Sequence, residues 1–263
     1  MPSHWGTKSL NIVSGSSATA TQVLHAVGMA EAGVLYSRIA EIPDRDAAFH
    51  GDEIIYASLG EGSTSEGEFW ESISAACTRH LPVLFLVEDN GYAISTPVEV
   101  ETPGGDISKL LGGFPGLHIE TADGTDLFDS VRAMRAASAY IRATRGPALV
   151  HAHVIRPYSH SLSDDERLYK TAAEREAEAR RDPIGRLAEF IRSHGLASAA
   201  DLAAIDADVE REVNLAAEQA LHADKPARST AARFVYSPNV DPTSAAFDTP
   251  AHPHGKQIGR AHV

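Results

Sequence analysis

Residues 54–67 of the 263-residue chain read IIYASLGEGSTSEG, an apolar run followed at once by a glycine-rich turn. An apolar run of this length that ends at glycine predicts a strand buried on both faces, as in a parallel sheet. The residues from about Glu66 to Arg79 then favour a helix. Strand, turn and helix in this order form the repeating unit of α/β folds.

The same alternation continues on both sides of this stretch. A helix is predicted before it, over about residues 17–39, where small residues are frequent. After it, the pattern predicts strands at 81–87, 117–121 and 148–155, and a helix at 126–144 that Asp126 caps. The fold class is therefore α/β, with a doubly wound, mostly parallel sheet. Ligands bind such sheets beyond the carboxyl ends of the strands, which here means the turns after Leu59, Val87 and Ile155.

The composition changes after Arg156. Charged, amphipathic helices are predicted at 171–181, 182–193 and 201–222, and Pro, Ser, Thr, His and Gly dominate from Ser237 onward. We therefore divide the chain into an α/β domain at 1–168, a C-terminal helical region at 169–236 and a linker or disordered tail at 237–263. The last seven residues, 257–263, look like a translated sequencing adapter and are left out of the fold prediction.

Charge and cysteine content exclude several classes of protein. The 23 Lys and Arg residues against 36 Asp and Glu give a net charge of −13, which argues against a nucleic-acid partner. Cys77 is the only cysteine, so no disulfide can form within the chain. No apolar run approaches the ~20 residues that span a bilayer, and the N-terminus lacks a secretory pattern. We expect a cytoplasmic protein without a membrane partner.

The glycine-rich turn predicts a metal site. Its spacing is not that of a dinucleotide fingerprint, because four residues separate Gly62 from Gly67. Glu61 would repel a phosphate in this turn unless a divalent cation such as Mg²⁺ bridged the two. The next strand ends near Asn90, which offers an amide oxygen beside a glycine turn that can expose a carbonyl. An ordinary strand-to-helix turn is the alternative reading of Gly-Glu-Gly alone.

Gly60-Glu61-Gly62, followed after 27 residues by Asn90, resembles the thiamine diphosphate signature. Over residues 1–236 the chain resembles the α-type part of the E1 component of 2-oxoacid dehydrogenase complexes, which implies a sheet of the thiamine-diphosphate-binding type. Glu61 and Asp164-Asp165 fit the branched-chain (2-oxoisovalerate) type best. The other matching stretches are Met1–Trp5, Ser16–Gln22, Gly60–Gly67, Asp89–Pro97, Asp123–Asp126 and Arg156–Lys170.

The resemblance implies thiamine diphosphate and Mg²⁺ as cofactors. Glu61, Asn90 and the Tyr92 carbonyl would bind the Mg²⁺ ion. The residues expected against the organic cofactor are Ser17, Gly60, Glu61, Gly62, Ser63, Asn90 and His160. A monovalent cation such as K⁺ would lie at Ser16, Thr21 and Gln22.

The resemblance also implies roles for the loop after the last strand. His160 would be a catalytic histidine at the mouth of the active site, and Ser161 lies where mitochondrial members are phosphorylated. The residues expected to order this loop for a lipoyl domain are Arg156, Ser161, Asp164, Tyr169 and Lys170. His151 and His153 alternate on the predicted strand before this loop, and we expect them to need no metal.

The implied reaction is oxidative decarboxylation of a small 2-oxoacid, with acyl transfer to a lipoyl group of the E2 acyltransferase. A β part would complete the site in an α2β2-type assembly, so the chain alone is expected to be inactive. A pyruvate or acetoin dehydrogenase α part is the alternative within this chemistry, and a non-catalytic truncated module that keeps the fold is the alternative outside it. A nicotinamide-dependent dehydrogenase is the weakest option, because the turn lacks the required glycine spacing.

The chain departs from the family pattern in three ways. An upstream segment that normally contacts the diphosphate does not precede Met1. Glu88 stands where the family often has an arginine that pairs with the diphosphate. No β region follows, although the Ala-Pro-His linker after Asp248 resembles the junction of E1 enzymes with fused α and β parts. We therefore expect a fragment of a fused chain.

Overall fold

The computed structural model describes residue 4 and residues 6–41, 49–232 and 243–245. The chain divides into two compact units, Met1–Ala199 and Ala200–Val263, and each is described by itself. The matching stretch Met1–Trp5 and the predicted tail at 237–263 lie outside the described residues, apart from His4 and residues 243–245.

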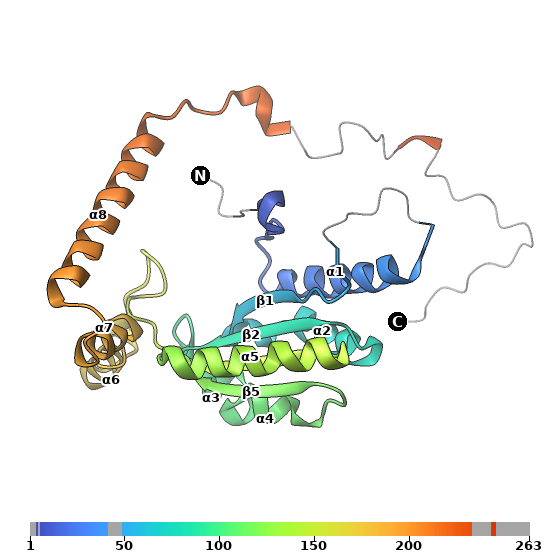
Figure 1. The fold of residues 1–263 in the computed structure, drawn as a ribbon, viewed down its shortest axis with the longest axis horizontal. Coiled ribbons are helices and arrows are strands. Elements are labelled where there is room, and N and C mark those ends of the chain that lie inside the picture. The colour runs from blue at the N-terminus through green and yellow to red at the C-terminus, as the bar shows by residue number, and fades with distance from the viewer. Residues whose placement is uncertain (1–3, 5, 42–48, 233–242, 246–263) are drawn as a thin grey trace, which may run out of the picture. The chain divides into compact units, whose positions relative to one another are not determined.

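A four-stranded parallel sheet in the order β1-β2-β6-β5 forms the centre of the first unit (Figure 1). Its strands are β1 (Ile55–Gly60), β2 (Val83–Asp89), β5 (His118–Asp123) and β6 (Ala148–His153). A short antiparallel hairpin of β3 (Tyr92–Ala93) and β4 (Thr96–Pro97) follows β2. The predicted doubly wound, mostly parallel α/β fold is confirmed.

Helices cover both faces of this sheet. The long helices are α1 (Thr21–Arg38), α2 (Gly67–Arg79) and α5 (Leu127–Thr144). Two single-turn helices, α3 (Val98–Glu101) and α4 (Ile107–Leu110), lie between the hairpin and β5 in the sequence. The first unit ends with α6 (Ala172–Ala179) and α7 (Pro183–Ser193), and α8 (Ala199–His222) forms nearly all of the regular structure of the second. No helix among the described residues is long and apolar enough to cross a membrane.

The alternation of side chains along β2 divides the core in two. Phe85 and Val87 belong to the cluster that includes Ile73 of α2, whereas Leu84 and Leu86 pack in the cluster that includes Ile141 of α5. Successive side chains of a strand point to opposite faces, so a central strand with helices on both sides is apolar throughout. This accounts for the apolar run of β2. Strand β1 lies at the edge of the sheet, and its Tyr56 is 53% exposed, so the prediction that the strand before Gly60 is buried on both faces is wrong.

Several predicted element boundaries shift in the structure; for example, the strand predicted at 148–155 ends at His153 and the one predicted at 117–121 runs from His118 to Asp123. Two of the shifts have a clear local cause. The strand predicted at 81–87 begins at Val83 and runs to Asp89, since Pro82 has no N–H to donate and β6 continues to pair with β2 as far as Asp89. The helix predicted from residue 17 begins at Thr21, because Ala20 adopts a left-handed conformation with φ of 65°. The predicted cap of α5 is confirmed, with Asp126 accepting from the backbone N of Phe128 at 2.9 Å.

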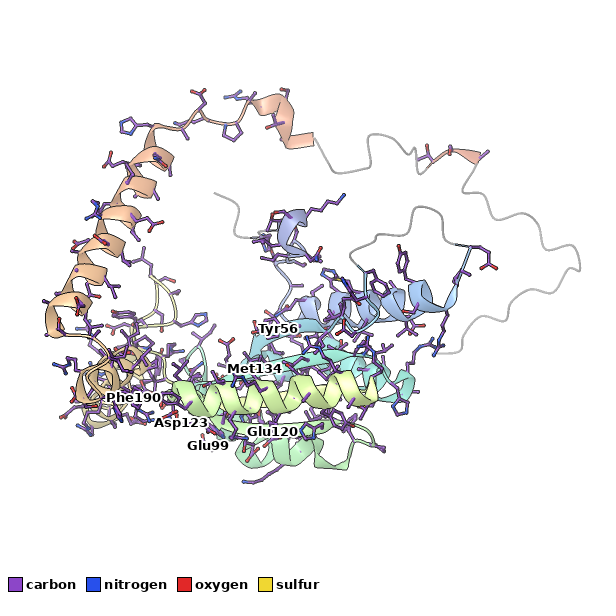
Figure 2. All side chains as sticks on the ribbon, in the orientation of Figure 1. Tyr56, Glu99, Glu120, Asp123, Met134 and Phe190 are labelled. Carbon is purple, nitrogen blue, oxygen red and sulfur yellow. The ribbon has the colours of Figure 1, made fainter. Side chains whose placement is uncertain are left out.

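The division between compact units falls at 199/200, within the predicted helical region at 169–236. Helix α7 is tied to the carboxyl end of β5, where Arg186 pairs with Asp123 and with Asp126, both at 3.1 Å. Phe190 of α7 packs on Phe128 of α5 with ring centroids 4.7 Å apart, and Figure 2 shows Phe190 close to Asp123. These contacts tie α7 to the sheet, and α6 belongs to the same compact unit. The expected helical region at 169–236 is thus split between the two units.

Candidate metal and cofactor site

Glu61 and Asn90 follow two neighbouring strands at the same edge of the sheet. Strands β1 and β2 pair in parallel with Gly60 opposite Glu88, so the residues that follow them leave the sheet side by side. Glu61 begins a 3₁₀ turn, Glu61–Ser65, that leads to α2. Asn90 leads into the β3–β4 hairpin. This is the edge at which parallel sheets bind ligands.

The Glu61 carboxylate is almost completely buried, with 1% of the residue exposed. Its Oε2 accepts hydrogen bonds from the Asn90 backbone N at 3.1 Å and from Asn90 Nδ2 at 3.4 Å. Among the described residues, neither Glu61 Oε1 nor Asn90 Oδ1 has a hydrogen-bond partner, although both atoms are buried. Buried oxygens are normally satisfied, and a hard divalent cation would satisfy these two together.

The charges around Glu61 also favour a cation. Burial raises the pKa of Glu61 to about 7; the backbone N–H of Asn90 acts against this, and the nearby carboxylates of Asp89 and Glu101 reinforce it. Glu101, on α3, has a buried Oε2 that likewise has no hydrogen-bond partner in the described part of the chain. Carboxylates crowded in this way repel a bare diphosphate. The donor set therefore fits Mg²⁺, which would hold the diphosphate away from direct contact with them.

The β3–β4 hairpin presses against the glycine-rich turn. A Cβ on Gly62 would lie 2.6 Å from Ala93 Cβ, so only glycine fits beside the hairpin without displacement.

The Gly91 carbonyl accepts from Val98 N at 2.9 Å. Hydrogen-bonded and non-hydrogen-bonded pairs alternate along an antiparallel ladder, so the next pair, Tyr92 and Pro97, exchanges no backbone hydrogen bonds. In such a pair the Tyr92 carbonyl points away from β4. The hairpin does not use this carbonyl, which is the third expected Mg²⁺ ligand.

Replacing Gly62 with alanine is expected to lower the free energy of unfolding by about 1–3 kcal/mol, because the new methyl overlaps Ala93. Gly67→Ala is the matched control: no atom lies within 4 Å of the Cβ it would add at the start of α2. Urea unfolding followed by circular dichroism measures both. Equal free energies of unfolding for the two variants would show that the hairpin can shift to admit the methyl group without loss of stability.

The residues expected at a monovalent-cation site lie around the start of α1. Gln22 Nε2 donates to the Ser58 carbonyl at 3.0 Å and so ties α1 to β1. Ser16 Oγ accepts from the backbone N of Ala18 at 3.4 Å. Among the hydrogen bonds of the described residues, none joins Ser16, Thr21 and Gln22 to one another. The cation site stays a prediction.

The other residues expected near the cofactor are placed as follows. Gly60 ends β1 and Ser63 lies within the 3₁₀ turn, so both flank the buried carboxylate. Ser17 is exposed in the segment before α1, where its Oγ lies 2.9 Å from His4 Nε2.

A chain of hydrogen bonds orders the loop after β6. Arg156 donates from Nη1 to the Ile94 carbonyl at 2.9 Å and from Nη2 to the Tyr169 hydroxyl at 2.5 Å. That hydroxyl donates to Asp164 Oδ2 at 2.6 Å. The bond lowers the pKa of Asp164, and burial together with the same bond raises the pKa of Tyr169 to about 12. Three of the residues expected in the loop network are thus connected.

Lys170 connects the same loop to the hairpin. The residue is 3% exposed, and its Nζ donates to the Glu178 carboxylate at 2.6 and 2.8 Å. The ammonium also lies 5.1 Å from the centroid of the Tyr92 ring, in cation–π geometry. The Tyr92 hydroxyl in turn donates to Glu174 of α6 at 3.3 Å. The hairpin that carries the Tyr92 carbonyl is therefore braced by α6.

His160 and Ser161 lie at the exposed part of this loop. The backbone N of His160 donates to Asp164 Oδ2 at 2.9 Å, which fixes its backbone within the network. Ser161 Oγ lies 3.2 Å from Ser163 Oγ. Both side chains are accessible to a partner or a substrate.

Tyr169→Phe is expected to speed tryptic cleavage after Arg167 severalfold, because it removes the hydroxyl that joins Arg156 to Asp164. A lost hydrogen bond of this kind costs about 0.5–1.5 kcal/mol, enough to raise the population of the open loop. Limited proteolysis followed by mass spectrometry provides the rates. Tyr158→Phe is the control, since Tyr158 is 80% exposed. Unchanged cleavage in Tyr169→Phe would mean that the hydroxyl does not hold the loop.

Glu88, at the position where the family often has arginine, is exposed. It lines a shallow pocket with Met134 of α5 and Ala152 of β6, on the α5 side of the sheet. Val87, next to it, belongs to the core on the opposite side. The Glu88 carboxylate thus faces outward.

Sequence reasoning gives no role to Asp89 or Glu101 at this edge, and it expects His151 and His153 to need no metal, whereas the structure brings Asp89, His151 and His153 together. Asp89 and His151 are buried, and His151 Nε2 lies 2.8 Å from Asp89 Oδ2. The available signal was His-Ala-His at the end of a strand, together with an aspartate at the end of another strand. Only the order of strands in the sheet shows that the two ends are neighbours.

Glu61 and Asn90 thus bring buried, unpartnered oxygens to the carboxyl edge of a parallel sheet, which is where α/β proteins of this architecture bind their ligands. The family model described as "Dehydrogenase E1 component" matches residues 2–229. The chain belongs to this family, and the predicted resemblance is confirmed.

The most informative relatives are α subunits. The 2-oxoisovalerate dehydrogenase subunit alpha of Bacillus subtilis (strain 168) is 32% identical over 239 residues, which cover 90% of this chain and 68% of that protein. The 3-methyl-2-oxobutanoate dehydrogenase subunit alpha of Mycobacterium tuberculosis is 36% identical, covering 67% of this chain and 44% of that protein. The human somatic, mitochondrial pyruvate dehydrogenase E1 component subunit alpha is 32% identical, covering 71% and 47%. The chain thus spans about two thirds of the first relative and about half of the others.

Proposed function

We propose that this chain is the α part of a branched-chain 2-oxoacid dehydrogenase E1 component, and that it binds the diphosphate of thiamine diphosphate through Mg²⁺. The observation that carries the proposal is the pair of buried, unpartnered oxygens, Glu61 Oε1 and Asn90 Oδ1, at the carboxyl edge of the sheet. The names of two relatives, which both denote a branched-chain 2-oxoacid, support the substrate class.

The residues of this chain would divide the work of binding. Glu61, Asn90 and the Tyr92 carbonyl would hold Mg²⁺, and the burial of Glu61 would keep water from competing for the ion. The residues that would lie against the organic cofactor are Ser17, Gly60, Gly62 and Ser63. When bound, thiamine diphosphate would supply the thiazolium ring, whose carbon adds to the keto group and which takes up the electron pair left when CO₂ departs. A monovalent cation at Ser16, Thr21 and Gln22 would steady the segment before α1.

The loop after β6 would face the substrate and the acyl acceptor. His160 would stand at the mouth of the site, on a backbone that Asp164 fixes. Ser161 would share the exposed surface that a lipoyl domain approaches. Arg156, Tyr169 and Lys170 would hold that surface in position through the contacts described above. These groups orient and bind, and none of them replaces the cofactor in the chemistry.

The proposal requires partners. An E1 β part would supply the catalytic glutamate that activates the cofactor, in an α2β2-type assembly or as a fused second half. The lipoyl domain of an E2 acyltransferase would accept the acyl group. The chain by itself is therefore expected to show no turnover.

The substrate assay uses the full chain assembled with the β subunit of a branched-chain relative. CO₂ release is measured with 3-methyl-2-oxobutanoate and with pyruvate, at saturating thiamine diphosphate and Mg²⁺. A higher kcat/KM for 3-methyl-2-oxobutanoate is expected. A higher kcat/KM for pyruvate would favour the alternative that the chain is a pyruvate dehydrogenase α part. The 32% identity with the human pyruvate dehydrogenase α subunit supports that alternative. Cofactor binding without any turnover would indicate a non-catalytic module.

A further inference from the structure

Asp89, His151 and His153 form a second group of metal-ligating side chains, at the carboxyl ends of β2 and β6. Asp89 lies opposite His153 in the parallel register of these strands. The alternation along β6 places His151 and His153 on one face. Each residue offers one ligand atom, and the three atoms lie within 4.8 Å of one another.

The distances suit a small transition-metal ion. Asp89 Oδ2 lies 2.8 Å from His151 Nε2 and 3.7 Å from His153 Nδ1. Ligand atoms bound at roughly 2.0–2.2 Å in tetrahedral geometry are about 3.4 Å apart, between those two separations. The three ligand atoms lie within 4.8 Å of one another, so rotation of the side chains by about an ångström would bring them to one ion. The side chain of His153 is 51% exposed, which leaves an entry path and room for a water ligand.

The second nitrogen of His151 provides an independent observation. His151 is completely buried, and its Nδ1 has no hydrogen-bond partner among the described residues. The nearest carboxylate oxygen recorded for it, Asp106 Oδ1, is 3.7 Å away. Asp106 is itself held, since it accepts from Ser108 Oγ at 2.6 Å and from Lys109 N at 3.1 Å.

A metal ion bound to Nε2 of His151 would allow both ring nitrogens of that residue to be satisfied. The ring proton would then reside on Nδ1 and point to Asp106, as in the carboxylate–histidine–metal groups that orient histidine ligands. Without a metal, the bond between Nε2 and Asp89 leaves Nδ1 buried and unsatisfied, at a cost. The nearby charges agree: Asp89 and Asp106 favour a cation, while Arg181, the cation close to His153, is paired with Asp123 at 3.3 Å.

We propose that Asp89, His151 and His153 bind a divalent transition-metal ion of the Zn²⁺ or Co²⁺ class, with Asp106 as the group that orients His151. Two imidazole nitrogens and one carboxylate oxygen select such ions over Mg²⁺, which prefers oxygen ligands. The ion would link β2 to β6 immediately before Asn90. This site shares no ligand with the Glu61 site, although Asp89 directly precedes Asn90, and it does not depend on the proposed function.

The test is a titration of the full chain with Co²⁺, followed by visible absorption, with millimolar Mg²⁺ present to occupy oxygen-only sites. One Co²⁺ per chain is expected, with the intense bands of tetrahedral coordination, and Zn²⁺ should displace it. His153→Ala should abolish these bands. His153 is half-exposed, so the fold should survive, and circular dichroism checks that it does. His25→Ala, at an exposed position of α1, is the matched control and should bind as the parent does.

Two further variants keep the proposal falsifiable. Asp106→Asn should weaken Co²⁺ binding by roughly 10-fold, because it removes only the orienting carboxylate. The double variant His252→Ala/His254→Ala removes the other two histidines that are two residues apart in the sequence, and it should leave Co²⁺ binding unchanged. Bands that persist in His153→Ala, or that vanish in His252→Ala/His254→Ala, would overturn the site. Absence of Co²⁺ binding in the parent chain would overturn it as well.

Discussion

Glu61→Gln is expected to weaken the binding of thiamine diphosphate in the presence of Mg²⁺ by about 100-fold or more. Glutamine keeps the size of the side chain and an oxygen that can still accept from Asn90, so the substitution removes little except the charge. An anionic ligand contributes strongly to Mg²⁺ affinity, and a loss near 3 kcal/mol corresponds to roughly this factor. Isothermal titration calorimetry, with the β subunit present, measures the change.

Glu66→Gln is the matched control for this measurement. Glu66 lies directly after the same 3₁₀ turn, but it is exposed. Its loss should leave the affinity within a factor of about two, as expected of a solvated surface charge. If Glu61→Gln bound the cofactor as tightly as the parent chain, Glu61 would not be a metal ligand and the site would need another explanation.

The contribution of Glu61 to the free energy of unfolding of the metal-free chain is expected to fall by about 3 kcal/mol between pH 4.5 and pH 8. Burial raises the pKa of Glu61 from 4.5 to about 7. In that interval the unfolded chain has released a proton that the folded chain still holds, so a rise in pH favours unfolding. The stabilisation is complete below the unfolded pKa and is lost as the pH passes the folded value.

Two comparisons assign this slope to Glu61. The Glu61→Gln variant should lack this fall of about 3 kcal/mol, because the carboxyl group that holds the proton in the folded chain is gone. Millimolar Mg²⁺ should flatten the profile of the parent chain, since a bound cation stabilises the ionised carboxylate. Chemical denaturation at pH 5, 6, 7 and 8 provides the values. An equal slope in Glu61→Gln would assign the effect to another group.

The parts of the fold that depend on local pattern could be predicted from the sequence. The apolar run before Gly60 predicted β1 correctly as a strand but not its burial, because β1 lies at the edge of the sheet and Tyr56 is 53% exposed. Asp126 carried the chemistry of a helix cap. The meeting of Glu61 and Asn90 also followed, because each directly succeeds a strand and the carboxyl ends of parallel strands share one edge.

The parts that depend on strand order could not be predicted in the same way. Strand β6 lies between β2 and β5 although it comes after both in the sequence, and this order alone brings His151 to Asp89. The attachment of α7 to the sheet depends in the same way on Arg186 reaching Asp123, 63 residues away in the chain. Neither contact leaves a periodic trace in the sequence.

The most direct test of the central claim is the metal dependence of cofactor binding by the parent chain assembled with a family β subunit. Thiamine diphosphate is titrated by calorimetry in Mg²⁺ and again in excess EDTA. The account predicts one thiamine diphosphate per chain with Mg²⁺ and no measurable binding with EDTA. Equal binding under both conditions, or none under either, would contradict the assignment of Glu61 and Asn90 to a Mg²⁺ site that anchors the diphosphate.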